Sequence, residues 1–156
     1  MRPAQDVGLA ARKGQKSIMH PVPQEDDYGC GCACIASIVG LTYAAVRKKL
    51  KWSHLRTGGL IAGQLSAGLK AFGRRYHVHF TKSRDVTTGD IPIGAIVKVR
   101  GKKYGTAGHY LVRTPDGWMD PWFNCPAGAG DTGPGRRNAK LRTRRPATIT
   151  SVLLPR

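Results

Sequence analysis

Cys30 has the residue type and the surroundings of a nucleophile for covalent catalysis. It follows Gln24 by six residues and opens an apolar segment that also holds Cys32 and Cys34. A thiolate is a much better nucleophile than a thiol, and the partial positive charge at a helix N-terminus favours the thiolate. If a helix begins near Cys30, this thiol is therefore placed for nucleophilic attack, whereas we interpret Cys32 and Cys34 as structural.

A cysteine nucleophile also needs a base, a group that orients the base, and donors for the developing oxyanion. His109 begins an apolar strand pattern, and Asp120 follows eleven residues later, beyond the turn signal Thr114-Pro-Asp-Gly117. A two-residue loop in that turn would put Leu111 opposite Asp120 and bring His109 and Asp120 to one face of the sheet. A three-residue loop with a bulge would reverse that parity, and both registers fit the sequence.

A metal site is the main alternative use of these residues. Cys30 and Cys34 would share a helix face, and a distant His109 or Cys125 could complete the ligand set. The paired Cys-x-x-Cys spacing that is typical of zinc sites is absent from the sequence. We therefore predict no metal and no other cofactor. Asp120 has an alternative of its own, as an ordinary strand-end residue before a proline.

The elements that must position these residues follow from hydrophobic periodicity. Residues 28–39 are almost wholly small or apolar, which indicates a helix buried on every side, with Asp27 as its N-cap and Gly40 at its end. Two further helices are expected, one at 42–50 that its first threonine caps, and one at 61–72 whose apolar stripe starts with its first residue. The N-terminal half is therefore predicted to be helical.

The hydrophobic period changes in the second half of the chain. Strand patterns follow at 76–80, 91–99, 110–112, 118–119 and 148–154. Helices first and antiparallel strands afterwards predict an α+β domain in which the helical half packs on a C-terminal sheet. We expect one domain over residues 17–156, with a basic flexible lead-in at 1–16 and a flexible, Gly/Pro-rich and basic loop at 126–146.

Net charge is the most unusual bulk property of the chain. Its 156 residues carry 26 lysines and arginines against 9 aspartates and glutamates, a formal charge of +17. Such a field attracts polyanions, so nucleic acid, an acidic protein surface and an acidic substrate segment are all candidate partners. No run of 18 apolar residues and no secretory signal are present, so we expect no membrane span. Three cysteines at 30, 32 and 34 are too crowded for a disulfide framework, which favours reduced thiols and a cytoplasmic location.

The order of these motifs resembles that of the papain-like cysteine peptidases, and more narrowly the bacteriocin-processing domains that remove double-glycine leader peptides. The matching positions, within residues 18–123, are Gln24, Cys30-Gly-Cys-Ala-Cys-Ile-Ala36, Gly59-Leu60, Ile91–Ile96, Gly108–Val112 and Asp120-Pro121. The resemblance implies a papain-like fold with a catalytic triad, in which Cys30 is the nucleophile, His109 the base and Asp120 its orienting group. It also implies that Gln24 and the backbone N–H of Cys30 donate to the oxyanion. The sequence departs from the family at Tyr28-Gly29, because an acidic residue usually precedes the nucleophile.

These observations predict a thiol hydrolase, most simply a cysteine peptidase that cleaves a peptide or protein. The charge favours an acidic substrate, and the resemblance a Gly-Gly cleavage site. The same triad could serve acyl transfer, deamidation or removal of a protein modifier, because an acyl-enzyme can be resolved by an amine as well as by water. The alternative from another class is a basic nucleic-acid- or virion-associated binding protein with a vestigial cysteine site.

Overall fold

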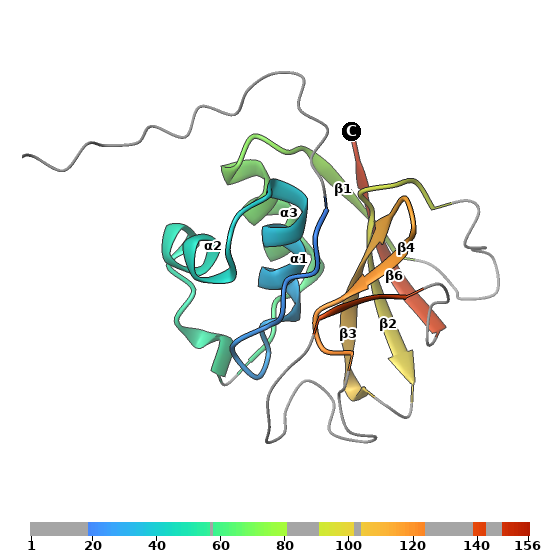
Figure 1. Ribbon diagram of the computed structural model, residues 1–156, viewed down its shortest axis with the longest axis horizontal. Coiled ribbons are helices and arrows are strands. Elements are labelled where there is room, and N and C mark those ends of the chain that lie inside the picture. Colours follow the sequence, from blue (N-terminus) through green and yellow to red (C-terminus); the bar gives the residue numbers. More distant parts are fainter. Residues whose placement is uncertain (1–18, 57, 81–90, 102–103, 124–138, 143–147) are drawn as a thin grey trace, which may run out of the picture.

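The computed structural model describes residues 19–56, 58–80, 91–101, 104–123, 139–142 and 148–156. Within them, helices lie on one side and an antiparallel sheet on the other (Figure 1). The predicted α+β architecture, with a helical half packed on a C-terminal sheet, is confirmed. The lead-in expected at 1–16 lies outside the described residues, as does most of the loop expected at 126–146.

The cysteine helix, α1, spans Cys30–Val39 and is buried along almost its whole length. Gly40 takes the left-handed conformation, with a φ of 71°, and ends the helix as its place in the sequence predicts. The start of the helix differs from the expectation, because the Gly29 N–H donates to the Asp26 carbonyl at 3.1 Å and closes a turn there. Gly29 is therefore the N-cap, and the prediction of Asp27 as the cap is wrong.

Two more helices, α2 (Tyr43–Leu50) and α3 (Ala62–Ala71), pack beside α1, and a short 3-10 turn, η1 (His54–Arg56), lies between them in the sequence. Thr42 caps α2 as predicted, because its side chain accepts from the backbone N–H three residues later at 3.2 Å. Ile61, predicted on the apolar stripe of α3, is instead 66% exposed. It precedes α3 in an extended conformation, so its side chain leaves the buried face. Among the described helices, none is long and apolar enough to cross a bilayer alone, and α1 and α2 meet that standard only as a pair bent by 106°.

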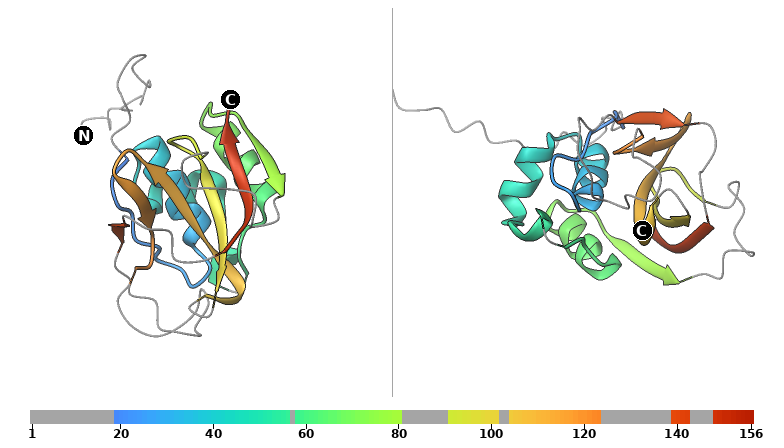
Figure 2. Two further views of the ribbon diagram at one scale, coloured as in Figure 1. Left: turned by 90° about the vertical axis from the view of Figure 1, so that its right-hand side faces the viewer. Right: turned by 90° about the horizontal axis from the view of Figure 1, so that it is seen from below.

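Within the described residues, six strands form one antiparallel sheet. They are β1 (Tyr76–Phe80), β2 (Ile96–Gly101), β3 (Gly105–Thr114), β4 (Gly117–Asp120), β5 (Lys140–Arg142) and β6 (Thr148–Pro155). Their spatial order is β1-β6-β2-β3-β4-β5, so the last strand returns to lie between β1 and β2. The views in Figure 2 show the helices gathered on one face of this twisted sheet.

Two of the strand predictions need correction. β2 starts at Ile96 and not at residue 91, because the Ala95 N–H donates to the Pro92 carbonyl at 3.1 Å and turns the chain just before the strand. β5 falls inside 126–146, the segment predicted as a flexible loop, and pairs with the last three residues of β4. Its basic composition gives no strand pattern, so the strand depends on the edge that β4 offers.

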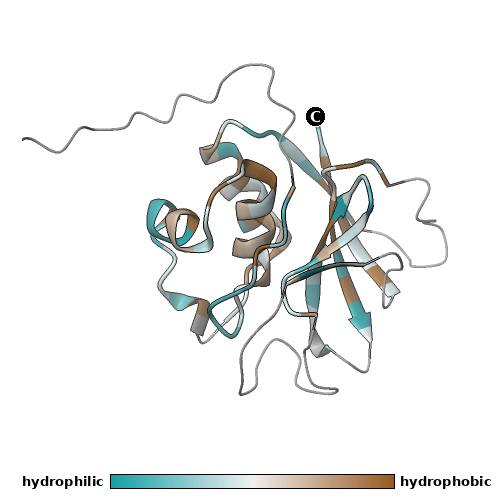
Figure 3. Cartoon of the chain, viewed as in Figure 1, coloured by the Kyte–Doolittle hydropathy of each residue, from teal (hydrophilic) through white to brown (hydrophobic). Residues whose placement is uncertain are grey.

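Alternation along the strands divides the buried side chains into two clusters. The cluster between the helices and the sheet holds most of α1, including Cys30, and takes Tyr110, Val112 and Met119 from β3 and β4. The second cluster takes the intervening residues Leu111 and Trp118, together with Trp122, on the other face of the sheet. Figure 3 shows the apolar character of α1 where it faces the sheet. Successive residues of one strand therefore serve different cores.

Candidate active site

Cys30 lies where the sequence predicts it, at the first residue of α1. Its side chain is only 3% exposed, and α1 packs against β3, the strand that carries His109. The N–H groups in the first turn of a helix have no partners within the helix and carry partial positive charge. No acidic side chain stands in the first turn of α1 to offset that charge. The start of α1 therefore presents partial positive charge to the Cys30 side chain.

Side chains of α2 hold the turn that precedes Cys30. The Tyr43 hydroxyl donates to Asp26 Oδ2 at 2.8 Å, and Arg47 Nε lies 2.8 Å from the same oxygen. Burial raises the pKa of Tyr43 above its ordinary value, so the hydroxyl remains a donor. A Cβ added to Gly29 would lie 2.1 Å from the Tyr43 oxygen. This contact is a physical reason for glycine immediately before Cys30.

Gln24 holds the same turn from its other side. Its side chain is 1% exposed and donates through Nε2 to the carbonyl oxygens of Asp26 at 3.1 Å and Asp27 at 3.0 Å. Its backbone N–H donates to the carbonyl of Pro121 at 3.2 Å, which joins the cysteine turn to the residue after Asp120. An amide nitrogen has two hydrogens, and both are directed to these carbonyls. Before Gln24 can donate to an oxyanion, Nε2 must therefore exchange one of these two hydrogen bonds for a hydrogen bond to the substrate.

His109 and Asp120 meet across the hairpin of β3 and β4. The ladder pairs Val112 with Met119 and Thr114 with Gly117, which leaves a two-residue loop. This is the first of the two registers that the sequence allows, and it puts Leu111 level with Asp120. His109 Nε2 lies 2.7 Å from Asp120 Oδ1, and both side chains are fully buried. Because a carboxylate only accepts, Nε2 carries the hydrogen, which makes Nδ1 the acceptor of the neutral ring.

Two aromatic residues surround this pair. Tyr104 donates its hydroxyl to Asp120 Oδ2 at 3.2 Å, and its ring stacks on that of His109 with centroids 4.5 Å apart and planes 11° apart. The backbone N–H of Trp122 donates to Asp120 Oδ1 at 3.1 Å. These contacts fix the carboxylate and, through it, the imidazole. No sequence pattern points to Tyr104, which lies in the connection between β2 and β3, where its backbone N–H donates to the Gly101 carbonyl at 3.0 Å.

Cys30 and the backbone beside His109 line one cavity of about 160 Å³. Gly108 and Tyr110, which flank His109 in β3, both belong to its walls. β4 ends at Asp120, which is opposite Leu111 in the ladder. No residue of β4 therefore pairs with β3 at His109. The chain that follows β4 instead contacts Gln24 through the Pro121 carbonyl. The cysteine turn and the His109–Asp120 pair therefore approach each other at the same end of β3.

The other described cysteines, unlike Cys30, are not among the residues that line this cavity. Burial raises the pKa of Cys32 to about 12, so its thiol stays protonated at neutral pH. Cys34, also on α1, is fully buried in the hydrophobic core between the helices and the sheet. In the described part of the chain, no group of three or more histidine, cysteine, aspartate or glutamate side chains is arranged to hold a metal ion. Cys125, considered as a ligand from the sequence, lies outside the described residues.

No protein-family model and no curated protein matches this chain. Among solved structures, it is similar to the peptidase domain of Streptococcus ComA, a bifunctional ABC transporter involved in a quorum sensing pathway, with a TM-score of 0.55. The similarity covers 88% of this chain and 99% of that domain, at 19% sequence identity. Identity at this level is evidence about the fold. The chain therefore has the α+β, papain-like fold of a peptidase domain, as its order of motifs implies.

Proposed function

We propose that this protein is a thiol hydrolase, and specifically a cysteine peptidase that uses Cys30, His109 and Asp120. The observation that carries the proposal is the buried His109–Asp120 pair, 2.7 Å apart. The residues on either side of His109 in β3 line the same cavity as Cys30, the first residue of α1. The fold of a peptidase domain supports the same conclusion. A peptide or protein is the corresponding substrate.

In the proposed reaction, His109 Nδ1 accepts the proton of the Cys30 thiol, and the sulfur forms a bond to the substrate carbonyl carbon. The electron pair of the carbonyl moves onto its oxygen. As the tetrahedral intermediate collapses, the imidazolium gives its proton to the leaving amine and the C–N bond breaks, which leaves a thioester. Water, deprotonated by the imidazole, then attacks the thioester and releases a carboxylic acid and the free thiol. Asp120 orients the imidazole and stabilises its protonated form.

The oxyanion needs donors that point to the place where negative charge develops. We assign this role to the backbone N–H of Cys30 and to Gln24 Nε2. Gln24 can take it only by giving up one of its bonds to the carbonyls of Asp26 and Asp27. A Gln24→Ala variant is therefore expected to lose both a donor and a contact that holds the cysteine turn. We expect kcat of this variant to fall on the order of a hundredfold, as for the loss of one oxyanion donor.

Two alternative functions are consistent with part of these observations. Acyl transfer, deamidation and modifier removal would use the same atoms, and mass spectrometry of the products separates them from peptide hydrolysis. Nucleic-acid binding with an inactive thiol is supported by the net charge of +17. It predicts salt-sensitive binding of DNA or RNA that persists in Cys30→Ala, and the absence of such binding at low salt would remove it.

Labelling with limiting iodoacetamide near neutral pH, followed by peptide mapping, tests the proposed function. We expect Cys30 to be modified in preference to Cys32, Cys34 and Cys125. The preference should disappear in His109→Ala, because an activated thiolate depends on its base. Equal, slow labelling of all four cysteines would contradict the proposal.

A further inference from the structure

Lys98 is the charged side chain among the described residues that line the Cys30 cavity. Besides Cys30, the other residues that line it are Tyr28, Gly59, Leu60, Ile61, Gly108 and Tyr110. A cavity of about 150 Å³ admits a molecule the size of benzene, and this one measures about 160 Å³. It therefore has room for one substrate side chain next to the thiol, with a single cation in its wall.

The Lys98 side chain packs against β3. Its Nζ lies 5.5 Å from the centroid of the Tyr110 ring, and its Cε would be 3.1 Å from a Cβ at Gly108. Gly108 has a φ of 74° and no side chain, so the lysine stem can cross its backbone. The Tyr110 ring is fixed in turn, because its hydroxyl donates to the Leu60 carbonyl at 3.0 Å. The ammonium therefore lies at the cavity wall, near the residue that precedes His109.

Two carboxylates near the cavity contact groups outside its wall. Asp26 accepts from Tyr43 and pairs with Arg47, and Asp120 contacts His109. Neither belongs to the cavity wall. The positive charge of Lys98 thus faces a small space with apolar and aromatic walls, where an anion would be attracted more strongly than in open solvent.

We propose that Lys98 selects substrates with an aspartate or glutamate side chain next to the scissile bond, and that this side chain occupies the Cys30 cavity. The inference rests on the proposed peptidase function and names its substrate class. The apolar walls contact the methylene groups of the acidic side chain, while the ammonium pairs with its carboxylate. The net charge of +17 attracts an acidic segment from a distance, whereas Lys98 determines which of its residues lies at the thiol.

Two alkylating reagents of similar size test Lys98 without a known substrate. Iodoacetate carries a carboxylate and iodoacetamide is neutral, and each forms a thioether with a thiolate as iodide leaves. The ratio of their rates at Cys30 therefore measures the local attraction for an anion. In Lys98→Met, which keeps an unbranched stem against Gly108, we expect the iodoacetate-to-iodoacetamide ratio to fall on the order of fivefold.

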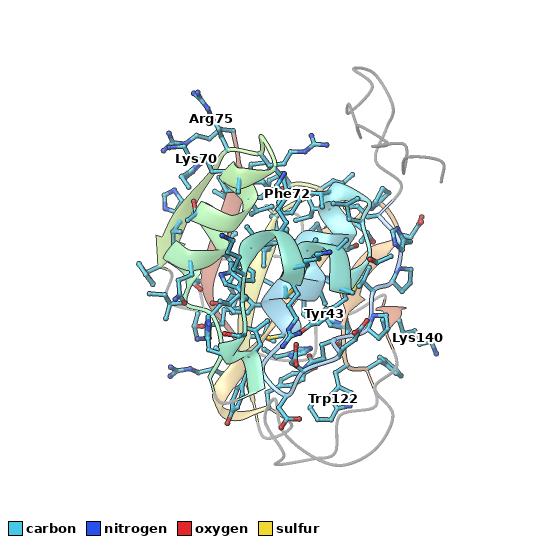
Figure 4. All side chains as sticks on the ribbon, turned by 90° about the vertical axis from the view of Figure 1, so that its left-hand side faces the viewer. Tyr43, Lys70, Phe72, Arg75, Trp122 and Lys140 are labelled. Carbon is cyan, nitrogen blue, oxygen red and sulfur yellow. The ribbon has the colours of Figure 1, made fainter. Side chains whose placement is uncertain are left out.

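Lys70→Met is the matched control, because it removes the same charge far from the cavity. Lys70 is near the C-terminal end of α3, about 12 Å along the helix from its first residue. Figure 4 shows Lys70 and Arg75 together at one end of the molecule and Trp122 at the other. The ratio should stay at its wild-type value in this variant, because more than a Debye length of screened solvent weakens the contribution of a distant lysine.

Peptide pairs that differ by glutamate or glutamine at each position around the cleaved bond give the second readout. We expect one position at which glutamate raises kcat/KM in the wild type, and this preference should vanish in Lys98→Met and invert in Lys98→Glu. If Cys30 labels normally and the iodoacetate-to-iodoacetamide ratio is equal in Lys98→Met and Lys70→Met, the role assigned to Lys98 is overturned but the proposed function is not. Failure of both reagents to prefer Cys30 in the wild type would overturn the proposed function itself.

Discussion

The two halves of the candidate site are held in different ways. His109 and Asp120 belong to one hairpin, in which the backbone ladder of β3 and β4 sets their separation. The turn before Cys30 depends on α2, which supplies Tyr43, and on contacts with the chain after β4. One half is therefore determined by local pairing and the other by contacts between distant segments. Substitutions far from the thiol should disturb the cysteine turn more readily than the hairpin.

The largest effect is expected from Asp120→Asn in the hairpin half. An asparagine can present its N–H₂ group to His109 Nε2 and so favour the tautomer with hydrogen on Nδ1, which cannot accept the thiol proton. We expect kcat to fall on the order of ten-thousand-fold while the fold is retained. Asp116→Asn, in the exposed loop of the same hairpin, is the control and should change activity little. Activity of Asp120→Asn within tenfold of the wild type would show that the pair does not act as an orienting unit.

Gly29→Ala should have the largest effect on the cysteine turn. The new Cβ would lie 2.1 Å from the Tyr43 hydroxyl oxygen, and overpacking of this kind costs about 1–3 kcal/mol of folding free energy. Thermal unfolding should reveal the loss, together with slower alkylation of Cys30. Adding Tyr43→Phe should restore part of the stability, because the oxygen is removed while a ring carbon remains 2.9 Å away.

Gly63→Ala is the matched control for this substitution. It lies inside α3 with no heavy atom within 4 Å of an added Cβ, so the better helix propensity of alanine should leave stability equal or higher. Equal stability of Gly29→Ala and Gly63→Ala would contradict the role given to the Tyr43 contact.

A smaller effect is expected from Tyr104→Phe. The variant keeps the ring stacked on His109 and removes the hydroxyl that donates to Asp120. Because one charged hydrogen bond is lost and two other groups still contact the carboxylate, we expect kcat to fall about tenfold with KM unchanged. Tyr76→Phe is the control, since its hydroxyl donates to the Gly94 carbonyl away from the site. Equal kinetics of the two variants would mean that Tyr104 acts only through packing.

Much of the fold follows from periodicity and from glycine and threonine signals. Gly40 ends α1 and Thr42 caps α2 where the sequence predicts, because both effects depend on a few adjacent residues. β5 could not be predicted, since a three-residue basic strand has no pattern of its own and forms on the edge of β4. The exposure of Ile61 could not be predicted either, because helical spacing does not show at which residue the first turn of the helix starts.

The site was predictable to the extent that it is local. Strand alternation limits His109 and Asp120 to two arrangements, and the structure has the one that brings them together. The part played by Tyr43 could not be read from the sequence, because it reaches Asp26 from a different helix. Tyr104 could not be predicted for a similar reason, since it reaches His109 from the connection between β2 and β3.

The pH dependence of Cys30 alkylation by iodoacetamide tests the central claim most directly. If His109 activates Cys30, the wild-type rate should remain high well below pH 8.5, the ordinary pKa of a cysteine thiol, and His109→Ala should return the profile to that value. Cys32 should stay unlabelled in the same samples, because burial raises its pKa to about 12. A wild-type profile that rises only near the ordinary thiol pKa, unchanged in His109→Ala, would contradict the account.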